Sequence, residues 1–270
     1  MKNGKRVSLS TRSLEEETGQ IILLTDQTET RRLQEQVSRG QRLSALGRMV
    51  SALAHQIRTP LSAAILYASH LSERDLTREQ TKRFSQKIVS RLNNLEQQVR
   101  DMLVFAKGDV TLSDSMTIGS MLEELKVAVD VPLSANKATL LINNDFSDSR
   151  IICNTQTMIG ALSNLVNNAL QASEVGADIQ LTTRREGRDI VISIEDHGCG
   201  IPENIMQRLQ QEEAFVSTKS QGTGLGLAVV RAVVKAHQGE FELTSTEGCG
   251  TQALIKLPCI HAAPRHLAAG

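Results

Sequence analysis

The sequence predicts an α+β protein in which an antiparallel helical hairpin precedes a mixed α/β domain. Two observations support this fold class. Between residues 28 and 107, apolar residues recur at three- and four-residue steps, which is the spacing of amphipathic helices. From 117 to 258, short β-branched runs alternate with helical segments and glycine-rich turns, which is typical of a sheet covered by helices. A chain of 270 residues is long enough for two compact units.

The composition argues against several classes of function. Lys plus Arg and Asp plus Glu number 30 each, so there is no bulk charge for binding nucleic acid or an anionic membrane. The four cysteines form no Cys-x-x-Cys pair, which argues against a zinc site or a disulfide framework and favours a reducing compartment. No apolar run approaches the roughly 20 residues that span a bilayer, and the first residues lack a signal-peptide core. We therefore expect a cytoplasmic protein with no membrane segment in this chain.

The first residues predict a small β-hairpin. Residues 5–10 and 20–26 have the composition of two strands, and a polar turn separates them. A single hairpin has too little core to be stable alone. We interpret residues 1–27 either as the remnant of a larger sensory domain or as a frayed segment.

Two long amphipathic helices are predicted within residues 28–108. The first runs from Thr28 to about Leu71, and the second begins near Thr77, whose hydroxyl is a candidate N-cap. Gly108 ends the second helix, and a linker follows over 109–115. Because two helices alone bury their apolar faces poorly, we expect two copies of the chain to form a homodimer with a four-helix bundle. A monomeric hairpin packed on the C-terminal domain is the alternative.

His55 is the candidate nucleophile of the hairpin. Within the segment Ala-His-Gln-Ile-Arg-Thr-Pro-Leu at 54–61, His55 lies beside the apolar seam and not on it, so its imidazole should face water. An exposed imidazole is available for reaction at neutral pH. Pro60 removes a backbone hydrogen bond from the same helix and is expected to bend it.

Residues 116–260 are predicted to form one layer of helices on a mixed sheet, followed by a tail over 261–270. The predicted helices lie at 118–129, 155–172 and 223–237, and the predicted strands at 139–143, 150–152, 178–183, 189–195, 241–245 and 251–257.

Asn164 and Asn168 lie one turn apart on the 155–172 helix and share a face. Carboxamide oxygens in this arrangement can ligate Mg²⁺ or its waters. Helix capping or simple solvation of the two side chains is the alternative for an isolated pair.

Asp196 directly follows a predicted strand in the segment Asp-His-Gly-Cys-Gly. A carboxylate at a strand end can accept a hydrogen bond from an exocyclic amine such as N6 of adenine, and Gly198 and Gly200 permit close approach of the backbone. Many ordinary turns have the same pattern, so this segment alone is weak evidence.

The segment Gly-Thr-Gly-Leu-Gly-Leu at 222–227 opens a helix, so its N–H groups and the helix dipole converge where phosphates would lie. It is not a Walker loop, because no Gly-Lys-Ser/Thr follows. The polar segment 203–221 before it includes Phe-Val-Ser-Thr-Lys at 215–219, an apolar anchor and a cation that suit a lid over a triphosphate. Residues 248–251 predict a tight turn, which either packs under the nucleotide or is a plain hairpin.

In this order and at these spacings, the segments resemble those of the sensor histidine kinases of two-component systems. Segment 54–61 is similar to the H box of that family, 164–169 to the N box, 196–200 to the G1 box, 215–219 to the F box and 222–227 to the G2 box. The resemblance covers about 28–258 and implies a HisKA dimerisation and phosphotransfer domain, then an ATP-binding domain of the GHKL (Bergerat, HATPase_c) type. Residues 1–27 are similar to the end of a PAS domain.

The resemblance implies that His55 accepts a phosphoryl group from ATP and passes it to an aspartate of a response regulator. Asn168 would ligate Mg²⁺, Asp196 would bind adenine, and Thr59 would orient water for dephosphorylation of the regulator. The further nucleotide contacts implied are Gly198, Gly200, Phe215, Thr218, Lys219, Gly222, Thr223, Gly224, Leu225, Gly226, Leu227 and Thr251.

Two positions depart from common patterns of these families. Gln56 stands where many members have a carboxylate; an amide can orient the imidazole but is a negligible base, so we expect reduced or differently assisted autophosphorylation. Asn164 stands where ATP-hydrolysing GHKL relatives have a glutamate base, which fits transfer to histidine and not to water. The alternatives are an ATP-binding dimeric adaptor or regulator phosphatase with little autokinase activity, and a kinase acting on serine of a partner.

The segments 42–49 and 168–172 resemble most those of kinases that serve NtrC-type regulators, and among them the flagellar sensor kinases of pseudomonads. The expected docking surface for the receiver domain is the first helix below His55 together with the start of the second helix.

Overall fold

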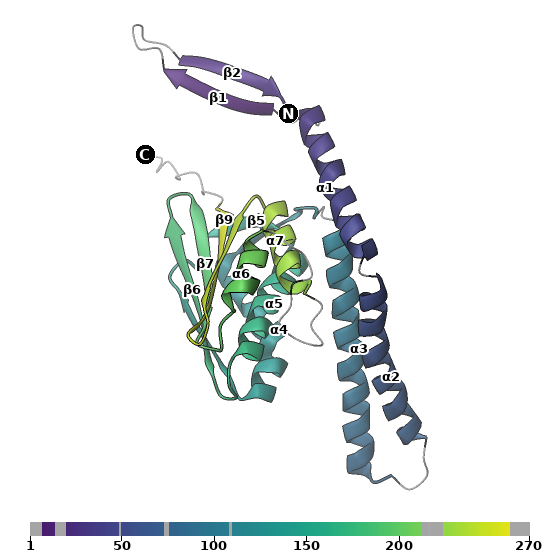
Figure 1. Ribbon diagram of the computed structural model, residues 1–270. Coiled ribbons are helices and arrows are strands. Elements are labelled where there is room, and N and C mark those ends of the chain that lie inside the picture. Colours follow the sequence, from purple (N-terminus) through teal and green to yellow (C-terminus); the bar gives the residue numbers. More distant parts are fainter. Residues whose placement is uncertain are drawn as a thin grey trace, which may run out of the picture. The chain divides into compact units, whose positions relative to one another are not determined.

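The computed structural model describes residues 7–13, 20–48, 50–72, 76–107, 110–211, 216 and 224–259 (Figure 1). The chain divides into two units, 1–50 and 51–270, which are described separately. Within the part of the chain that the structure describes, no helix combines the length and the apolar character needed to cross a bilayer.

The first unit holds a β-hairpin and one helix. Strands β1 (Val7–Ser13) and β2 (Gln20–Asp26) pair antiparallel, so the predicted hairpin is confirmed, and its first strand continues to Ser13, beyond the predicted end at residue 10. Helix α1 (Thr28–Arg48) follows, and the carboxylate of Asp26 accepts a hydrogen bond from the Thr28 backbone N–H at 3.0 Å. The apolar side chains of residues 21–24 are all more than half exposed.

The helical hairpin consists of α2 (Val50–Leu71) and α3 (Arg78–Lys107). Helix is found over almost all of the predicted span from Thr28 to about Leu71: α1 ends at Arg48, α2 begins at Val50, and Met49 between them lies outside the described residues. The predicted N-cap at Thr77 is confirmed: its hydroxyl accepts from the Gln80 N–H at 3.2 Å, and the Gln80 amide oxygen accepts from the Thr77 N–H at 2.9 Å, which is a capping box.

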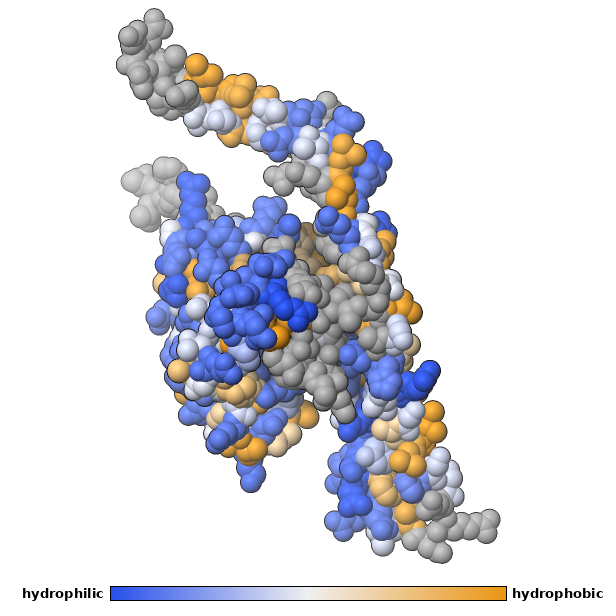
Figure 2. All heavy atoms as spheres, in the orientation of Figure 1, coloured by the Kyte–Doolittle hydropathy of each residue, from blue (hydrophilic) through white to orange (hydrophobic). Residues whose placement is uncertain are grey.

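The two helices of the hairpin leave an apolar face uncovered. The rings of Tyr67 and His70 stack on Phe84 with centroids 6.0 and 5.5 Å apart, which places the C-terminal part of α2 against the beginning of α3. Eight large apolar side chains described on the hairpin are nevertheless 41–61% exposed: Val50, Leu61, Ile65, Leu66, Val89, Leu92, Val99 and Leu103. Figure 2 shows apolar side chains along the visible surface of this hairpin.

The mixed α/β domain is a sheet with helices on one face, as predicted (Figure 1). The strand order is β4 (Thr139–Asn144), β6 (Asp178–Glu186), β7 (Asp189–Asp196), β9 (Gly250–Pro258) and β8 (Glu240–Thr246). Only the β4–β6 pair of this sheet is parallel. Strands β3 (Asp114–Thr117) and β5 (Arg150–Cys153) form a separate antiparallel pair.

The helices of this domain are α4 (Ile118–Asn136), α5 (Thr155–Ala172), α6 (Glu203–Gln210) and α7 (Gly226–Ala236). The core lies between the sheet and the helices, with fully buried side chains such as Leu125, Leu162 and Ile192. Ion pairs among Arg184, Glu186, Lys256 and Asp189 lie at the β6–β7–β9 end of the sheet.

Two expectations for this domain need correction. Helix α4 continues to Asn136, beyond the predicted end at 129, and includes Pro132. No helix was predicted within the polar segment 203–221, yet its first part forms α6, because Met206 and Leu209 on one helix face pack in a small apolar cluster with Val216.

Candidate functional site

One cavity of about 1080 Å³ in the second unit brings together most of the residues singled out in the sequence. It is lined from α2 by His55, Gln56 and Thr59, and from α5 by Asn164 and Asn168. Residues from the sheet and from the start of α7 complete the sequence-predicted part of its lining: Asp196, Gly200, Gly224, Gly226, Leu227 and Thr251. Gly198 and the fully buried Leu225 do not line it. The cavity is at the upper end of the size that small-molecule sites have.

His55 is exposed on α2, as its place beside the apolar seam predicted. The helix remains continuous through Pro60, and the Thr59 hydroxyl donates a hydrogen bond to the His55 carbonyl oxygen at 3.1 Å. Gln56 is half-buried on the next position of the helix. The phosphoacceptor candidate is thus a solvent-accessible imidazole on a regular helix, with a hydroxyl one turn further along.

Asp196 ends the central strand β7 and is 6% exposed. Burial raises the pKa of its carboxyl, while the backbone N–H groups of Gly198 and Thr251 donate to it and oppose that rise. The Gly198 bond to Oδ1 is 2.9 Å long. A carboxylate with two donors still has acceptor capacity, so Asp196 can receive a hydrogen bond from a ligand amine in the cavity.

The glycines around Asp196 are required by close packing of backbone on backbone. A Cβ on Gly198 would lie 2.4 Å from the Ala172 carbonyl oxygen, and one on Gly250 would lie 2.0 Å from the Asp196 carbonyl oxygen. Gly200 has a φ of +66° and would meet the Thr246 carbonyl oxygen at 2.1 Å. The turn at 248–251 therefore packs directly under Asp196, which is more than a plain hairpin would require.

Ser245 does not line the cavity but supports two of its loops, a role that the sequence analysis missed. Its hydroxyl donates to the Gly250 carbonyl oxygen at 2.8 Å, accepts from the Ile201 N–H at 2.9 Å and lies 2.9 Å from the Thr251 hydroxyl. This side chain ties the β8–β9 turn to the loop after Asp196. A serine in a strand of alternating polarity gives no sequence signal for such a role.

The N-box asparagines lie on the cavity side of α5. The position of a Cβ on Gly226 is 3.8 Å from the Asn168 side-chain nitrogen, so the first residue of α7 lies against Asn168. Asn167, which the sequence analysis did not single out, also lines the cavity.

Asn164 has a different neighbour. Its amide donates to the Asp101 carboxylate of α3 at 3.5 Å, and Gln97 donates to the same carboxylate at 2.8 Å. Burial raises the pKa of Asp101 against these two hydrogen bonds. The Asn164 side chain therefore contacts α3 of the hairpin. Because it is an amide and not a carboxylate, it cannot act as a general base.

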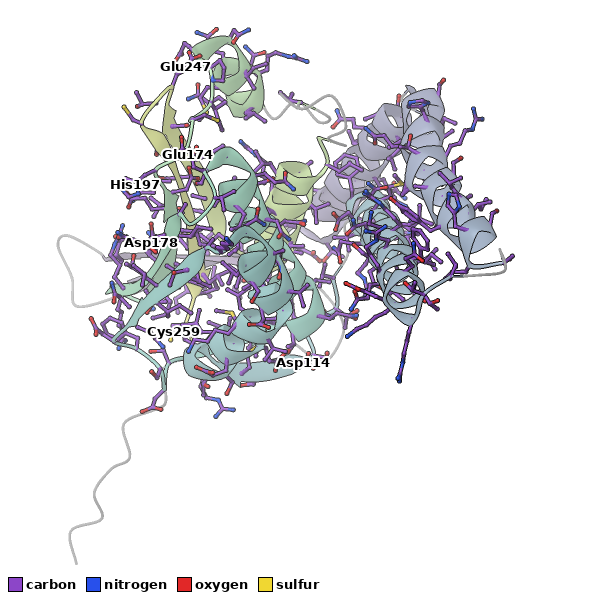
Figure 3. All side chains as sticks on the ribbon, turned by 90° about the horizontal axis from the view of Figure 1, so that it is seen from below. Asp114, Glu174, Asp178, His197, Glu247 and Cys259 are labelled. Carbon is purple, nitrogen blue, oxygen red and sulfur yellow. The ribbon has the colours of Figure 1, made fainter. Side chains whose placement is uncertain are left out.

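The oxygen atoms available in the cavity fit a magnesium ion that binds together with a nucleotide. Among the described residues, no three His, Cys, Asp or Glu side chains meet in an arrangement that could hold a metal ion. A smaller hollow of about 420 Å³ has Glu174, Asp178 and His197 in its lining (Figure 3), and it too lacks such a cluster. Mg²⁺ is commonly held by one or two protein oxygens together with substrate phosphates. The Asn168 carboxamide beside the N-terminus of α7 meets that requirement.

Most residues of the predicted lid lie outside the residues that the structure describes. Phe215, Thr218, Lys219, Gly222 and Thr223 are not among the described residues. Around them, Val216 is buried in the α6 cluster, and Gly224 has a φ of +64° just before α7 begins. Helix α7 begins at Gly226, three residues later than predicted.

Comparisons with known proteins match both halves of the chain. Residues 45–110 match the His Kinase A (phospho-acceptor) domain, and residues 154–260 match the family of histidine kinase-, DNA gyrase B- and HSP90-like ATPases. The chain is 47% identical over 266 residues to the sensor protein kinase FleS of Pseudomonas aeruginosa, with 98% of this chain and 65% of FleS covered. It is 26% identical over 246 residues to the signal transduction histidine-protein kinase AtoS of Escherichia coli, with 89% of this chain and 39% of AtoS covered.

The chain therefore spans less than two thirds of the length of these curated relatives. Among solved structures, the histidine kinase ThkA in complex with the response regulator protein TrrA is similar with a TM-score of 0.63 and 21% identity, with 95% of this chain and 80% of that chain covered. The histidine kinase AdeS of Acinetobacter baumannii has a TM-score of 0.57 and 19% identity, with 77% of this chain and 98% of that chain covered. At these identities the two structures support the fold alone.

Proposed function

This chain belongs to the sensor histidine kinases of two-component systems, and from that premise we propose that it phosphorylates its own His55 with ATP and transfers the phosphoryl group to an aspartate of a response regulator. The observation that supports this most is the shared cavity: the exposed His55 on a regular helix lines the same space as Asn168 and Asp196, the proposed nucleotide-binding residues. Adaptors that only bind ATP do not need a histidine there.

The proposed reaction is an in-line phosphoryl transfer. An imidazole nitrogen of His55 attacks the γ-phosphorus of ATP, the N–P bond forms as the bond from γ-phosphorus to the bridging oxygen breaks, and ADP leaves. The Asp196 carboxylate accepts a hydrogen bond from the exocyclic amine of adenine, and the N–H groups at the start of α7 donate to phosphate oxygens. Asn168 would hold Mg²⁺, which neutralises charge on the phosphates. Little more than positioning is needed from the protein.

Gln56 and Thr59 are proposed to tune this chemistry. Gln56 can orient the imidazole but cannot remove its proton, so autophosphorylation should be slower than with a carboxylate at this position. Thr59 is exposed one turn after His55, where its hydroxyl could orient water during dephosphorylation of the regulator. The phosphatase and adaptor alternative rests on Gln56 and predicts ATP binding with little labelling.

The partners we propose are a second copy of this chain and a receiver domain. The exposed apolar side chains of α2 and α3 would be covered in a dimeric four-helix bundle. The receiver would belong to an NtrC-type regulator in a flagellar pathway, as the resemblance of segments 42–49 and 168–172 to flagellar sensor kinases implies. Residues 1–27 are proposed to be the end of a PAS-like region.

The decisive experiment incubates the protein with γ-labelled ATP and Mg²⁺ and compares wild type with His55→Ala. His70→Ala is the matched control, because His70 lies on the same helix and does not line the cavity. We expect a label that is stable in base and labile in acid, absent from His55→Ala and present in His70→Ala. ATP binding without any label in wild type would instead support the adaptor or phosphatase alternative.

A further inference from the structure

His237 is a buried titratable side chain that the proposed reaction does not use. It lies at the C-cap of α7 and is only 2% exposed. Its Nε2 accepts a hydrogen bond from the backbone N–H of Asn154 at 2.9 Å, and its Nδ1 lies 2.7 Å from the Val233 carbonyl oxygen. Because a backbone N–H can only donate, Nε2 carries no proton and Nδ1 donates to Val233. Burial lowers the pKa of this imidazole, which agrees with the neutral form.

The bond from Asn154 joins the two helices of the nucleotide site. Asn154 is the N-cap of α5, with its side-chain oxygen accepting from the Thr157 N–H at 3.1 Å and its amide donating to the Thr111 carbonyl oxygen at 3.3 Å. The next residue, Thr155, donates to the carboxylate of Asp114 (Figure 3). The start of α5 is therefore held by Thr111, by Asp114 at the start of β3 and by the far end of α7.

The opposite ends of the same two helices form the phosphate end of the site. Asn168, near the end of α5, lies against Gly226, the first residue of α7. Asn154 and Asn168 are separated by about 21 Å of helix at 1.5 Å per residue. The two helices thus run antiparallel, with His237 at one end of the pair and the Asn168–Gly226 contact at the other.

The adenine end of the site is bonded to the end of α5. The backbone N–H of Cys199, in the turn after Asp196, donates to the Ala172 carbonyl oxygen at 2.9 Å, at the last residue of α5. A slip of α7 along α5 would leave this bond and Asp196 in place. It would change the distance between Asn168 and the phosphate-binding N–H groups of α7.

We propose that His237 is a positioning residue that fixes α7 against α5 and thereby sets the geometry of the phosphate and magnesium end of the nucleotide site. This inference rests on the proposed nucleotide site and names a residue outside the nucleotide-contacting set. It predicts that loss of the bond to Asn154 weakens binding of Mg·ATP and spares binding of adenosine.

The test compares two substitutions that separate the two bonds of His237. In His237→Gln, the side-chain oxygen reaches about as far as Nε2 and keeps an acceptor for the Asn154 N–H. In His237→Asn, the shorter amide keeps a donor for the Val233 carbonyl and loses that acceptor. Dissociation constants for Mg·ATP and for adenosine, which carries no phosphate, are measured by calorimetry on each variant and on wild type.

We expect His237→Asn to bind Mg·ATP about tenfold more weakly, the order of one lost hydrogen bond, with adenosine affinity unchanged within about twofold. His237→Gln should bind both as wild type does. Equal weakening of both ligands in His237→Asn, or unchanged Mg·ATP affinity in a folded variant, would overturn the proposal.

A measurement on wild type keeps the proposal testable if His237→Asn does not fold. Coupling between the two helix ends is reciprocal, so Mg·ATP should slow hydrogen exchange of the Asn154 amide more than adenosine does. The same exchange rate with either ligand would contradict the inference. Failure of wild type to bind Mg·ATP would overturn the proposed function and this inference together, whereas Mg·ATP binding without labelling of His55 would overturn only the kinase assignment.

Discussion

The β8–β9 turn offers a matched pair of substitutions, Gly250→Ala and Gly248→Ala. Both glycines have positive φ, +127° and +78°. A Cβ on Gly250 would lie 2.0 Å from the Asp196 carbonyl oxygen, about 1 Å closer than real contacts allow, whereas a Cβ on Gly248 would meet nothing within 4 Å. Gly248→Ala should therefore cost only the backbone strain, about 1 kcal/mol. Gly250→Ala adds displacement of Asp196 and loss of a hydrogen bond, for a total of about 2–4 kcal/mol.

Urea unfolding and ATP binding measure the two consequences. A loss of about 2–4 kcal/mol leaves a typical domain of about 5–15 kcal/mol folded, so both variants should be available for binding measurements. Gly250→Ala should bind ATP more than about tenfold more weakly, because the Asp196 carboxyl must shift, while Gly248→Ala binds as wild type does. If Gly250→Ala and Gly248→Ala have the same stability and the same ATP affinity, the packing of this turn under Asp196 does not set the site.

Three further outcomes follow from the site. Asp196→Asn should abolish ATP binding and leave the melting temperature at pH 7 unchanged or higher, because burial raises the pKa of this carboxyl and so disfavours its ionised form; a clear loss of stability would contradict this. Stability should fall as the pH drops below about 6.5, because the unfolded chain then takes up a proton at His237 that the folded chain, with its lowered pKa, does not; His237→Gln should remove this component of pH-dependent unfolding. Gln56→Glu should label faster than wild type in the γ-labelled ATP assay, and an equal or slower rate would refute the role given to the neutral side chain.

Residue type and local sequence context were enough to predict which residues are reactive. The contacts that residues make with parts of the chain far away in sequence could not be predicted in this way. The exposure of His55 followed from its place beside an apolar seam, and the N-cap at Thr77 followed from its sequence context. The role of Gly250 did not, because only the pairing of β9 with β7 brings it against Asp196. His237 was expected to end a helix. Nothing in that pattern indicates that its ring accepts a hydrogen bond from the backbone N–H of Asn154, 83 positions away.

One element was missed for a similar reason. Helix α6 was missed because its segment is polar overall, and its few apolar residues find partners only through Val216, beyond the helix itself. The information about this helix lies in contacts that a one-dimensional pattern does not contain.

The most direct test of the central claim is to locate the phosphoryl group. The protein is exposed briefly to ATP and Mg²⁺, digested at neutral or basic pH, and its peptides are analysed by mass spectrometry with fragmentation that preserves N–P bonds. The account predicts one phosphorylated peptide, with the phosphoryl group on the imidazole of His55. A phosphoryl group on a serine or threonine, or on a histidine other than His55, would contradict it.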